Sequence, residues 1–303
     1  MSITVIIPTF NRLEYLKITL NSCYSQSLLP DAIIVSDDSK DDVTENWILN
    51  EKLNSSVPLK YIHNKPALGQ GENVDSLIRA VDTDLLLLIH DDDYLLTDAL
   101  EDLNSILKEN SKTDVVFGKQ YLINQNGVIN KSGTEKLNKT FSRDESYEGK
   151  DLNPYSVLLR QQLPSNSFLI KTELAKKIGY GKKEFGGNGV DFHFCYKLAI
   201  NEVNFKFVNR FISYYRDSAD GVSKTTDSAF YAFQLVEKLN FDAEFLNTLR
   251  NDFLKYKAAI AITQALNNGL KKEALSIYFS RYHRREILTL GGLKRLQKLV
   301  INV

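Results

Sequence analysis

The chain has 303 residues, 43% of them hydrophobic, which is enough to bury a sizeable core in one large domain or two smaller ones. Lysine plus arginine and aspartate plus glutamate each number 38, so the net charge is zero and no global field favours nucleic acid as a partner. The two distant cysteines form no disulfide framework or zinc-binding spacing, and no signal-peptide pattern or apolar window of about 18 residues is present. We therefore expect a cytoplasmic protein without a membrane-spanning helix.

Hydrophobic patterns over the first 90 residues predict strands that alternate with helices. Short β-branched or aliphatic runs predict strands at 3–7, 32–36, 59–63 and 84–90. Helical spacing of apolar residues predicts helices at about 13–26, 43–53 and 72–81. This alternation is typical of a parallel, doubly wound sheet, so the predicted fold class is α/β, with a mostly parallel central sheet flanked by helices.

The regular alternation ends after Asp93. The patterns that follow predict helices at about 97–109, 155–163, 171–178 and 190–199, and strands at 115–118, 167–170, 205–208 and 211–215. Asn126-Gly127 predicts a hairpin turn, and the polar stretch 131–152 is predicted to be a mobile loop. From about Thr226 the chain reads as helical, so we expect an α/β domain over 1–222 and a C-terminal helical region over 223–303.

The end of the chain gathers basic residues among leucines. One acid, Glu286, accompanies six basic residues: Arg281, Arg284, Arg285, Lys294, Arg295 and Lys298. Such a pattern could form an amphipathic helix that makes peripheral contact with the inner face of a membrane. The alternative, which we favour, is a helix docked on the rest of the protein with its charges in water, because Gly291-Gly292 would weaken a helix.

Three carboxylates follow the fourth predicted strand, in the segment His90-Asp91-Asp92-Asp93. They would lie at the carboxyl end of a buried strand, where open α/β sheets bind ligands. Two charges about 4 Å apart repel by roughly 4 kcal/mol at an effective dielectric constant of about 20, and a divalent cation relieves this repulsion. The segment therefore predicts a metal–diphosphate site. The alternative is a solvated acidic loop that begins a helix.

Two other strand ends should open into the same crevice. Thr9–Arg12 follows the first strand, and Asp37–Asp38 follows the second. A carboxylate at the second strand end can accept hydrogen bonds from a nucleoside, or it can cap a helix. The sequence has neither G-x-G-x-x-G after the first strand nor G-x-x-x-x-G-K-[ST]. Their absence weighs against a dinucleotide site and against P-loop phosphoryl transfer.

Four segments form a series along the chain. They are Ile6-Ile7-Pro8-Thr9-Phe10-Asn11-Arg12, Val35-Ser36-Asp37-Asp38-Ser39-Lys40-Asp41, the stretch from Leu68-Gly69 through Asn73 to His90-Asp91-Asp92-Asp93-Tyr94-Leu95, and Val190-Asp191-Phe192-His193-Phe194-Cys195-Tyr196-Lys197-Leu198-Ala199. In this order they resemble the motifs "IIPTxNR", "VDDGSxD", "lGxxxNwn…lhDDDxl" and "EDxdlwlRla" of family 2 glycosyltransferases, which have the GT-A fold. The resemblance covers roughly residues 1–220.

The resemblance implies a nucleotide-sugar donor and assigns its contacts to matching positions. The segment Pro8, Thr9, Phe10 and Arg12 would hold the nucleotide base, Asp37 would bind the base ring, and Asn73 would lie near the nucleoside.

The resemblance also implies the residues that act on the diphosphate and the acceptor. Asp91 would contact the ribose, Asp92 would bind a divalent metal, Mn²⁺ or Mg²⁺, and Arg216 could reach a phosphate. Asp191 matches the catalytic base of inverting members, which takes the proton from an acceptor hydroxyl. The metal and nearby donors would stabilise the departing nucleoside diphosphate. From the residues themselves, Asp191 could instead be a helix N-cap.

Three positions depart from the family pattern. His90 stands where the family often has an aspartate, which leaves metal ligation mainly to Asp92. Val190 replaces a glutamate beside Asp191, and Ser218 replaces the histidine of "YRxH", which puts a late contact to metal or diphosphate in doubt. His193 is expected to be a residue of the helix surface rather than a ligand.

These observations predict an inverting, metal-dependent glycosyltransferase. It would move a sugar from a nucleotide donor, most simply UDP-linked, to a hydroxyl of a glycan or lipid-linked acceptor in bacterial surface-polysaccharide synthesis. Loops such as 131–152 and 181–189 would determine the specificity for the donor sugar, the acceptor and the linkage. Two alternatives stay open: a sugar nucleotidyltransferase, and a non-catalytic glycan-binding protein that keeps the fold.

Overall fold

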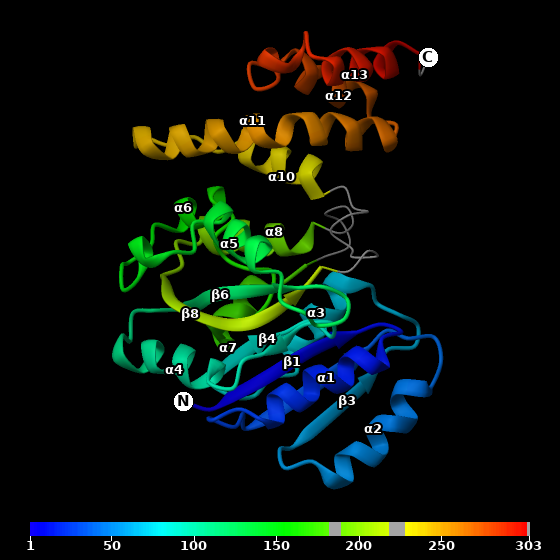
Figure 1. The fold of residues 1–303 in the computed structure, drawn as a ribbon, viewed down its shortest axis with the longest axis vertical. Coiled ribbons are helices and arrows are strands. Elements are labelled where there is room, and N and C mark those ends of the chain that lie inside the picture. The colour runs from blue at the N-terminus through cyan, green and yellow to red at the C-terminus, as the bar shows by residue number, and fades with distance from the viewer. Residues whose placement is uncertain (182–188, 218–227, 302–303) are drawn as a thin grey trace.

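The computed structural model describes residues 1–181, 189–217 and 228–301. Within these ranges an eight-stranded sheet carries helices on both faces, and further helices are stacked at one end of the molecule (Figure 1). Four features of the sequence analysis lie outside the described residues. They are the domain boundary at 222/223, the start of the helical region at Thr226, Ser218, and the loop 181–189 apart from its two ends.

The first four long strands are parallel, as predicted. In chain order the elements are β1 (Ile3–Thr9), α1 (Leu13–Tyr24), β2 (Ala32–Asp37), α2 (Val43–Asn54), β3 (Leu59–His63), α3 (Gln70–Arg79) and β4 (Leu85–Leu88). β1 lies between β2 and β4, with Thr9 opposite Asp37 and Ile6 opposite Leu88. The loops that follow these three strands therefore open at the same edge of the sheet. The aliphatic runs form the centre of the sheet because hydrophobic clusters cover both of its faces.

The second half of the sheet is mixed rather than parallel. The strand order is β3-β2-β1-β4-β7-β6-β8-β5, and β7 runs antiparallel to both of its neighbours. The remaining elements of this part are β5 (Tyr94–Leu95), α4 (Ala99–Glu109), β6 (Val115–Ile123), α6 (Pro154–Leu159), β7 (Phe168–Lys171), α7 (Thr172–Ile178), α8 (Val190–Ile200) and β8 (Phe205–Arg216). The doubly wound prediction thus holds only up to β4, because a buried apolar strand has the same sequence pattern in either direction.

The stretch 131–152 was predicted to be a loop, and this prediction was wrong. It contains the helix α5 (Lys131–Thr140) and the short 3₁₀-helix η1 (Glu145–Tyr147). Asn130 caps α5 by accepting from the backbone N–H of Gly133 at 2.9 Å. The inward face of α5 is polar: Thr134 accepts from the backbone N–H of Leu122, and Asn138 pairs with the main chain of Gln120. Hydrophobic periodicity cannot reveal such a helix.

The two late strands predicted at 205–208 and 211–215 are one strand, β8. It is parallel to β6, and the register shifts between Phe117 and Gln120. The polar pair Asn209-Arg210 interrupts the apolar pattern without ending the strand. The predicted hairpin turn at Asn126-Gly127 is present, with Ile123 bridged to Ile129.

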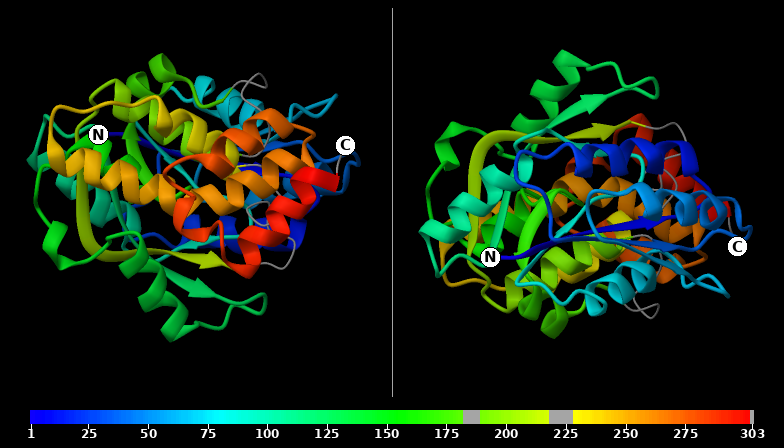
Figure 2. Two further views of the ribbon diagram at one scale, coloured as in Figure 1. Left: turned by 90° about the horizontal axis from the view of Figure 1, so that it is seen from above. Right: turned by 90° about the horizontal axis from the view of Figure 1, so that it is seen from below.

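The C-terminal helices form a third hydrophobic cluster away from the sheet. They are α10 (Ser228–Glu237), α11 (Glu244–Asn267), α12 (Lys271–Phe279), the 3₁₀-helix η3 (Arg284–Glu286) and α13 (Leu290–Ile301). Figure 2 shows α11 lying across this end of the molecule; it contacts α10 and α6, and α12 and α13 pack on it.

The basic segment at the end of the chain is divided between η3, which contains Arg284 and Arg285, and α13, which contains Lys294, Arg295 and Lys298 and packs on α11 and α12. Leu299 is buried there, whereas Leu288 and Leu290 are 87% and 81% exposed. Gly291-Gly292 lies in the first turn of α13 rather than in its middle, so the helix tolerates it. Among the described residues, no helix combines the length and apolarity needed to cross a bilayer.

Candidate active site

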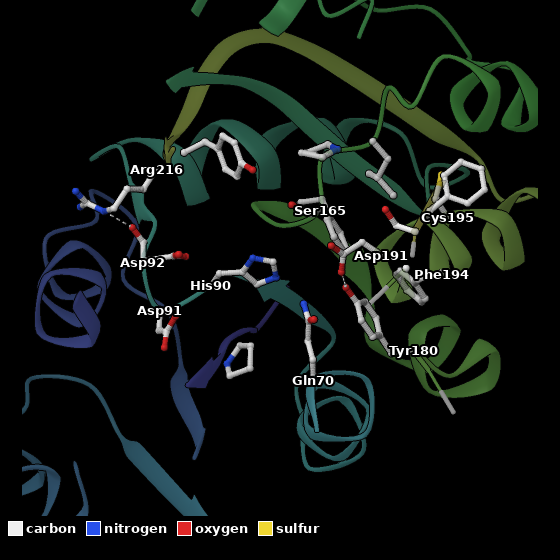
Figure 3. Close-up of a pocket in the computed structure, with 18 of the residues that line it drawn as sticks. Gln70, His90, Asp91, Asp92, Ser165, Tyr180, Asp191, Phe194, Cys195 and Arg216 are labelled. Carbon is white, nitrogen blue, oxygen red and sulfur yellow. Dashed lines mark hydrogen bonds between the residues drawn. The ribbon is translucent and has the colours of Figure 1, made fainter. Parts of the chain in front are cut away.

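A cavity of about 850 Å³ opens at the carboxyl ends of β1 and β4 and extends towards α8 (Figure 3). All of the predicted site residues except Asp37 line it: Pro8, Thr9, Phe10, Arg12, Asn73, Asp91, Asp92, Asp191 and Arg216. They come from the loops after β1 and β4, from α3, from the end of β8 and from the start of α8. Segments far apart in the sequence therefore meet in one site.

The strand-end acids are held by β1 and its loop. Arg12 Nη1 donates to Asp92 Oδ2 at 2.7 Å and lies 3.5 Å from Asp91 Oδ1. Thr9 Oγ1 and the backbone N–H of Phe10 donate to Asp91 Oδ2 at 2.7 and 3.3 Å. Burial of Asp91, with a contribution from the charge of Asp92, raises the pKa of Asp91 to about 6. A solvated acidic loop that begins a helix is therefore wrong, because α4 begins only at Ala99.

The third acid, Asp93, joins β4 to the end of β8. Its Oδ1 accepts from the backbone N–H of Arg216 and its Oδ2 from Asn166 Nδ2, both at 2.7 Å. Burial and the neighbouring Asp92 raise the pKa of Asp93 to about 7. Arg216 in turn donates through Nε to the carbonyl of Asp92 at 2.9 Å. These bonds fix the acidic segment against the end of β8 and the residues before β7, although Asp93 and Arg216 are 123 residues apart in the chain.

His90 points into the cavity between Asp92 and Asp191 (Figure 3). Its Nδ1 lies 3.1 Å from Asn166 Nδ2, the amide nitrogen that also donates to Asp93. Nδ1 is therefore the acceptor, and the ring N–H is at Nε2. Nε2 is buried and has no hydrogen-bond partner within the described part of the protein.

The two aspartates at the end of β2, Asp37 and Asp38, have different surroundings. Asp37 is fully buried, accepting from the backbone N–H of Ser39 at 2.7 Å and from the hydroxyl of Tyr61 at 2.8 Å. Asp38 lines the cavity and accepts from the backbone N–H groups of Leu68 and Gly69. The N-cap of α2 is Asp42, so the helix-capping alternative is wrong for Asp37 and Asp38.

Asp191 faces the acidic segment from the other wall of the cavity (Figure 3). Tyr180 donates its hydroxyl to Asp191 Oδ1 at 2.6 Å. Burial raises the pKa of Asp191, although the electrostatic effect of His90 and the hydrogen bond from Tyr180 oppose this shift. Gly189 is the N-cap of α8 and Asp191 makes no cap hydrogen bond, so the N-cap alternative is wrong. His193 is buried, at 9% exposed, and not on the helix surface as predicted.

Sequence reasoning missed several residues of the site. Tyr180 follows the helix-ending Gly179 in a stretch without a motif, and Asn166 precedes β7. Arg143 lies in the segment that was expected to be a loop, yet it lines the cavity. Asp38, which also lines the cavity, was given no role of its own, although it belongs to the motif at the end of β2 and could have been found from it.

Comparison with known proteins settles the family. The model of glycosyl transferase family 2 matches residues 4–163, which is more than half of the chain. The chain belongs to glycosyl transferase family 2. This glycosyltransferase is 26% identical over 272 residues to the GalNAc(5)-diNAcBac-PP-undecaprenol beta-1,3-glucosyltransferase of Campylobacter jejuni, covering 89% of this chain and 75% of that one. Membership of the family excludes the nucleotidyltransferase alternative.

Solved structures show that this glycosyltransferase has the predicted GT-A fold. TarS of S. aureus in complex with UDP gives a TM-score of 0.67 at 17% identity, covering 99% of this chain and 88% of that one. A mannosyltransferase of Pyrobaculum calidifontis in complex with GDP-Man and Mn²⁺ gives 0.60 at 14% identity, covering 99% and 87%. At these identities the likeness concerns the fold.

Proposed function

We propose that this glycosyltransferase inverts the anomeric configuration as it moves a sugar from a UDP-linked donor to a hydroxyl of a glycan or lipid-linked acceptor. The observation that carries this proposal is one cavity with the Arg12–Asp91–Asp92 cluster on one wall and the half-buried carboxylate of Asp191 on the other. Its relative in Campylobacter jejuni is named for an undecaprenol-linked acceptor, and TarS has been solved with UDP. The first supports a lipid-linked acceptor in bacterial surface-polysaccharide synthesis, and the second supports a UDP-linked donor.

The donor would lie over the carboxyl ends of β1, β2 and β4. Pro8, Thr9, Phe10 and Arg12 would border the base, and Asn73 the nucleoside, since all of them line this end of the cavity. Asp91 would accept a ribose hydroxyl, and Arg216 would face a phosphate. The assignment of the base ring to Asp37 stays a prediction, because its oxygens already bind Ser39 and Tyr61.

Asp191 would act as the base. It would accept the proton of the acceptor hydroxyl while that oxygen bonds to the anomeric carbon and the bond to the UDP oxygen breaks. One displacement of this kind inverts the configuration. A partly desolvated carboxylate with a raised pKa suits this task, because a base is most effective when its pKa lies near the working pH.

The acidic segment fits a divalent cation. Single ligand atoms of His90, Asp92 and Asp93 lie within 4.8 Å of one another. Oxygen ligands suit Mg²⁺ and Mn²⁺, and a bound cation would neutralise charge on the departing diphosphate. Asp92 is the residue that would hold it, because Asp93 already accepts two N–H groups and His90 Nε2 carries a proton. Arg12 would give up or share its hydrogen bond with Asp92.

Replacement of Asp191 tests whether sugar transfer can be lost while donor binding is kept. Asp191→Asn should lose transfer while its Kd for a UDP-sugar stays near the wild-type value, measured by product formation and calorimetry. Asp252→Asn, at an exposed carboxylate of α11, is the matched control and should keep both properties. Transfer near the wild-type rate in Asp191→Asn would show that Asp191 is not the base. Absence of turnover and of donor hydrolysis across a panel of nucleotide sugars would favour the non-catalytic glycan-binding alternative.

Two broader proposals concern the whole chain. We propose that 1–222 is the catalytic domain and that the helices of 223–303 bring it to the inner face of the membrane. Exposed Leu288 and Leu290 stand beside exposed Arg284 and Arg285, which suits an anionic surface. Sedimentation with vesicles of anionic and of neutral lipid tests this contact. Equal binding to both, or to neither, would contradict it.

A further inference from the structure

Arg143 is a cationic side chain in the same cavity, but it comes from a different part of the chain than the donor loops. It follows α5, lines the cavity and is only 4% exposed. Burial removes the guanidinium from water and lowers the pKa of Arg143 to about 9. A charge in such a position is costly unless an anion or well-placed dipoles compensate it.

The partners of Arg143 are all neutral. Nε donates to the carbonyl of Gln162 at 2.8 Å, and Nη1 donates to Gln120 Oε1 at 3.0 Å. The guanidinium also lies 5.2 Å from the ring centre of Phe141. In the described ranges no carboxylate lies within ion-pair distance of Arg143, and Nη2 takes part in none of these hydrogen bonds.

Two other arginines show how this protein normally compensates such a charge. Arg12 is paired with Asp91 and Asp92. Arg250, 7% exposed, donates to the carbonyls of Val236 and Glu237 at the end of α10, where the helix dipole is negative. Arg143 has neither kind of compensation, because Gln162 lies beyond the end of α6.

The surroundings hold Arg143 in place. Gln120 Nε2 donates to Ser213 Oγ at 3.1 Å, and its main chain pairs with Asn138. Gln162 Nε2 donates back to the carbonyl of Ser142 at 2.6 Å, so the segments around 143 and 162 brace each other. A guanidinium fixed in this way loses little freedom when it binds a ligand.

The cavity next to Arg143 is apolar. Leu137, Phe141 and Leu158 line it together with Arg143. Apolar walls exclude water and strengthen the attraction between a guanidinium and an oxyanion. From Gln162 the chain continues to Ser165, which lies on the wall beside Asp191 (Figure 3). Arg143 is thus connected through Gln162 to the segment that reaches Asp191, and it forms no hydrogen bond with the described loops after β1, β2 and β4.

We propose that Arg143 binds a phosphate or carboxylate group carried by the acceptor or by the transferred sugar, separate from the donor diphosphate. This rests on the proposed function, because it takes the diphosphate to lie at Arg12, Asp92 and Arg216. The substrate supplies the counter-ion that the protein lacks at this point. A neutral acceptor combined with a neutral sugar would leave the buried guanidinium uncompensated, so this site selects acidic substrates.

Calorimetry on the full chain tests the site, with UDP and Mn²⁺ present at saturation and with inorganic phosphate, D-glucuronate and D-glucose as probes. The wild type should bind phosphate or glucuronate saturably, and Arg143→Gln should weaken that binding at least tenfold. Arg143→Lys, which keeps the charge, should retain part of it. Arg210→Gln, at an exposed arginine of β8, is the matched control and should bind as the wild type does. The Arg143 site is overturned if neither anion binds saturably to the wild type, or if Arg143→Gln binds it equally well.

A second variant covers the case in which Arg143→Gln does not fold. Gln120→Glu places a carboxylate where Gln120 Oε1 now accepts from Arg143. If the guanidinium lacks a counter-ion, this variant should melt at a higher temperature than the wild type and should no longer bind the anionic probe. A lower melting temperature with unchanged anion binding would overturn the proposal.

Two further measurements show which substrate carries the anionic group and whether a failure concerns the Arg143 site or the proposed function. If UDP-glucuronate binds more tightly than UDP-glucose, and Arg143→Gln removes the difference, the anionic group is on the donor sugar. If the two donors bind equally and the UDP complex still binds the anionic probes, the anionic group is on the acceptor. Failure of the wild type to bind UDP would overturn the proposed function. Intact UDP binding without any anion binding would overturn the Arg143 site only.

Discussion

The hydroxyl of Tyr180 donates a hydrogen bond of 2.6 Å to Oδ1 of Asp191, and both side chains line the cavity, Tyr180 buried and Asp191 half-buried. Two effects on Asp191 oppose each other here. Burial disfavours the carboxylate and raises its pKa, whereas the bond from Tyr180 favours the carboxylate and lowers it. If Asp191 is the base, as we propose, Tyr180 helps to set the pH range in which it acts.

Removing this hydroxyl should shift the pH profile of the enzyme. In Tyr180→Phe the carboxylate of Asp191 loses a donor, so its pKa should rise above the already raised wild-type value. A hydrogen bond to a charged group contributes about 1.5–3 kcal/mol, which corresponds to about one to two pH units. Because the base must be deprotonated, the acidic limb of kcat/KM should move to higher pH by that amount. Tyr256→Phe, at a tyrosine that is 64% exposed, should leave the profile unchanged. An acidic limb that stays in place, or moves to lower pH, would contradict this role of Tyr180.

Metal removal tests the acidic segment. Chelation of divalent cations with EDTA should lower the transfer rate of the wild type by about 100-fold or more, because a cation at the leaving diphosphate contributes several kcal/mol. Added Mn²⁺ or Mg²⁺ should restore the rate. Asp92→Asn should not recover with added metal, whereas Asp98→Asn, at an exposed aspartate before α4, should behave as the wild type. Full activity of the wild type in EDTA would show that Arg12 and Arg216 neutralise the diphosphate without a metal.

His90 gives a separate test of how the metal is held. Its Nδ1 accepts from Asn166, so Nε2–H offers no lone pair to a cation. Replacement by the acid common in the family, His90→Asp, adds an oxygen ligand and should tighten Mn²⁺ binding about tenfold, measured by titration in the presence of UDP. His90→Asn, which is neutral, should bind Mn²⁺ as weakly as the wild type. A clear loss of Mn²⁺ affinity in His90→Asn would instead identify the histidine as a ligand.

The sequence predicted the residues at the carboxyl ends of β1 and β4 better than those on the opposite wall of the cavity, and the structure shows why. Arg12, Asp91 and Asp92 follow aliphatic strands whose ends must meet at one edge of a parallel sheet. Arg143 and Tyr180 follow helices in the mixed half of the chain, where no strand pattern places them. Their positions depend on buried polar contacts such as those of Asn138 with Gln120, which leave no periodic hydrophobic signal.

Burial explains the residues whose surroundings were misjudged. His193 is polar and stands beside a charged residue, so its type suggested the surface, yet α8 lies between the sheet and the C-terminal helices. The apolar contacts of α10 and α11 cover the side of α8 that a catalytic domain without them would expose. Such coverage depends on how distant helices pack, which one segment of sequence cannot reveal.

The contact between β6 and β8 at Gly118 leaves no room for a side chain. A Cβ atom added at Gly118 would lie 2.5 Å from Ile212 Cγ1 and 2.7 Å from the carbonyl oxygen of Arg210. The carbonyl belongs to the main chain and cannot turn away, so Gly118→Ala should lower the free energy of unfolding by about 1–3 kcal/mol, measured by urea denaturation. Gly291→Ala is the control, because its nearest neighbour, 3.5 Å away, is the flexible end of Arg295 and the position is helical. That variant should be neutral or up to about 1 kcal/mol more stable. Equal stability of Gly118→Ala and the wild type would mean that β8 can move away from β6, and the position of Arg216 at its end would then not be fixed by this contact.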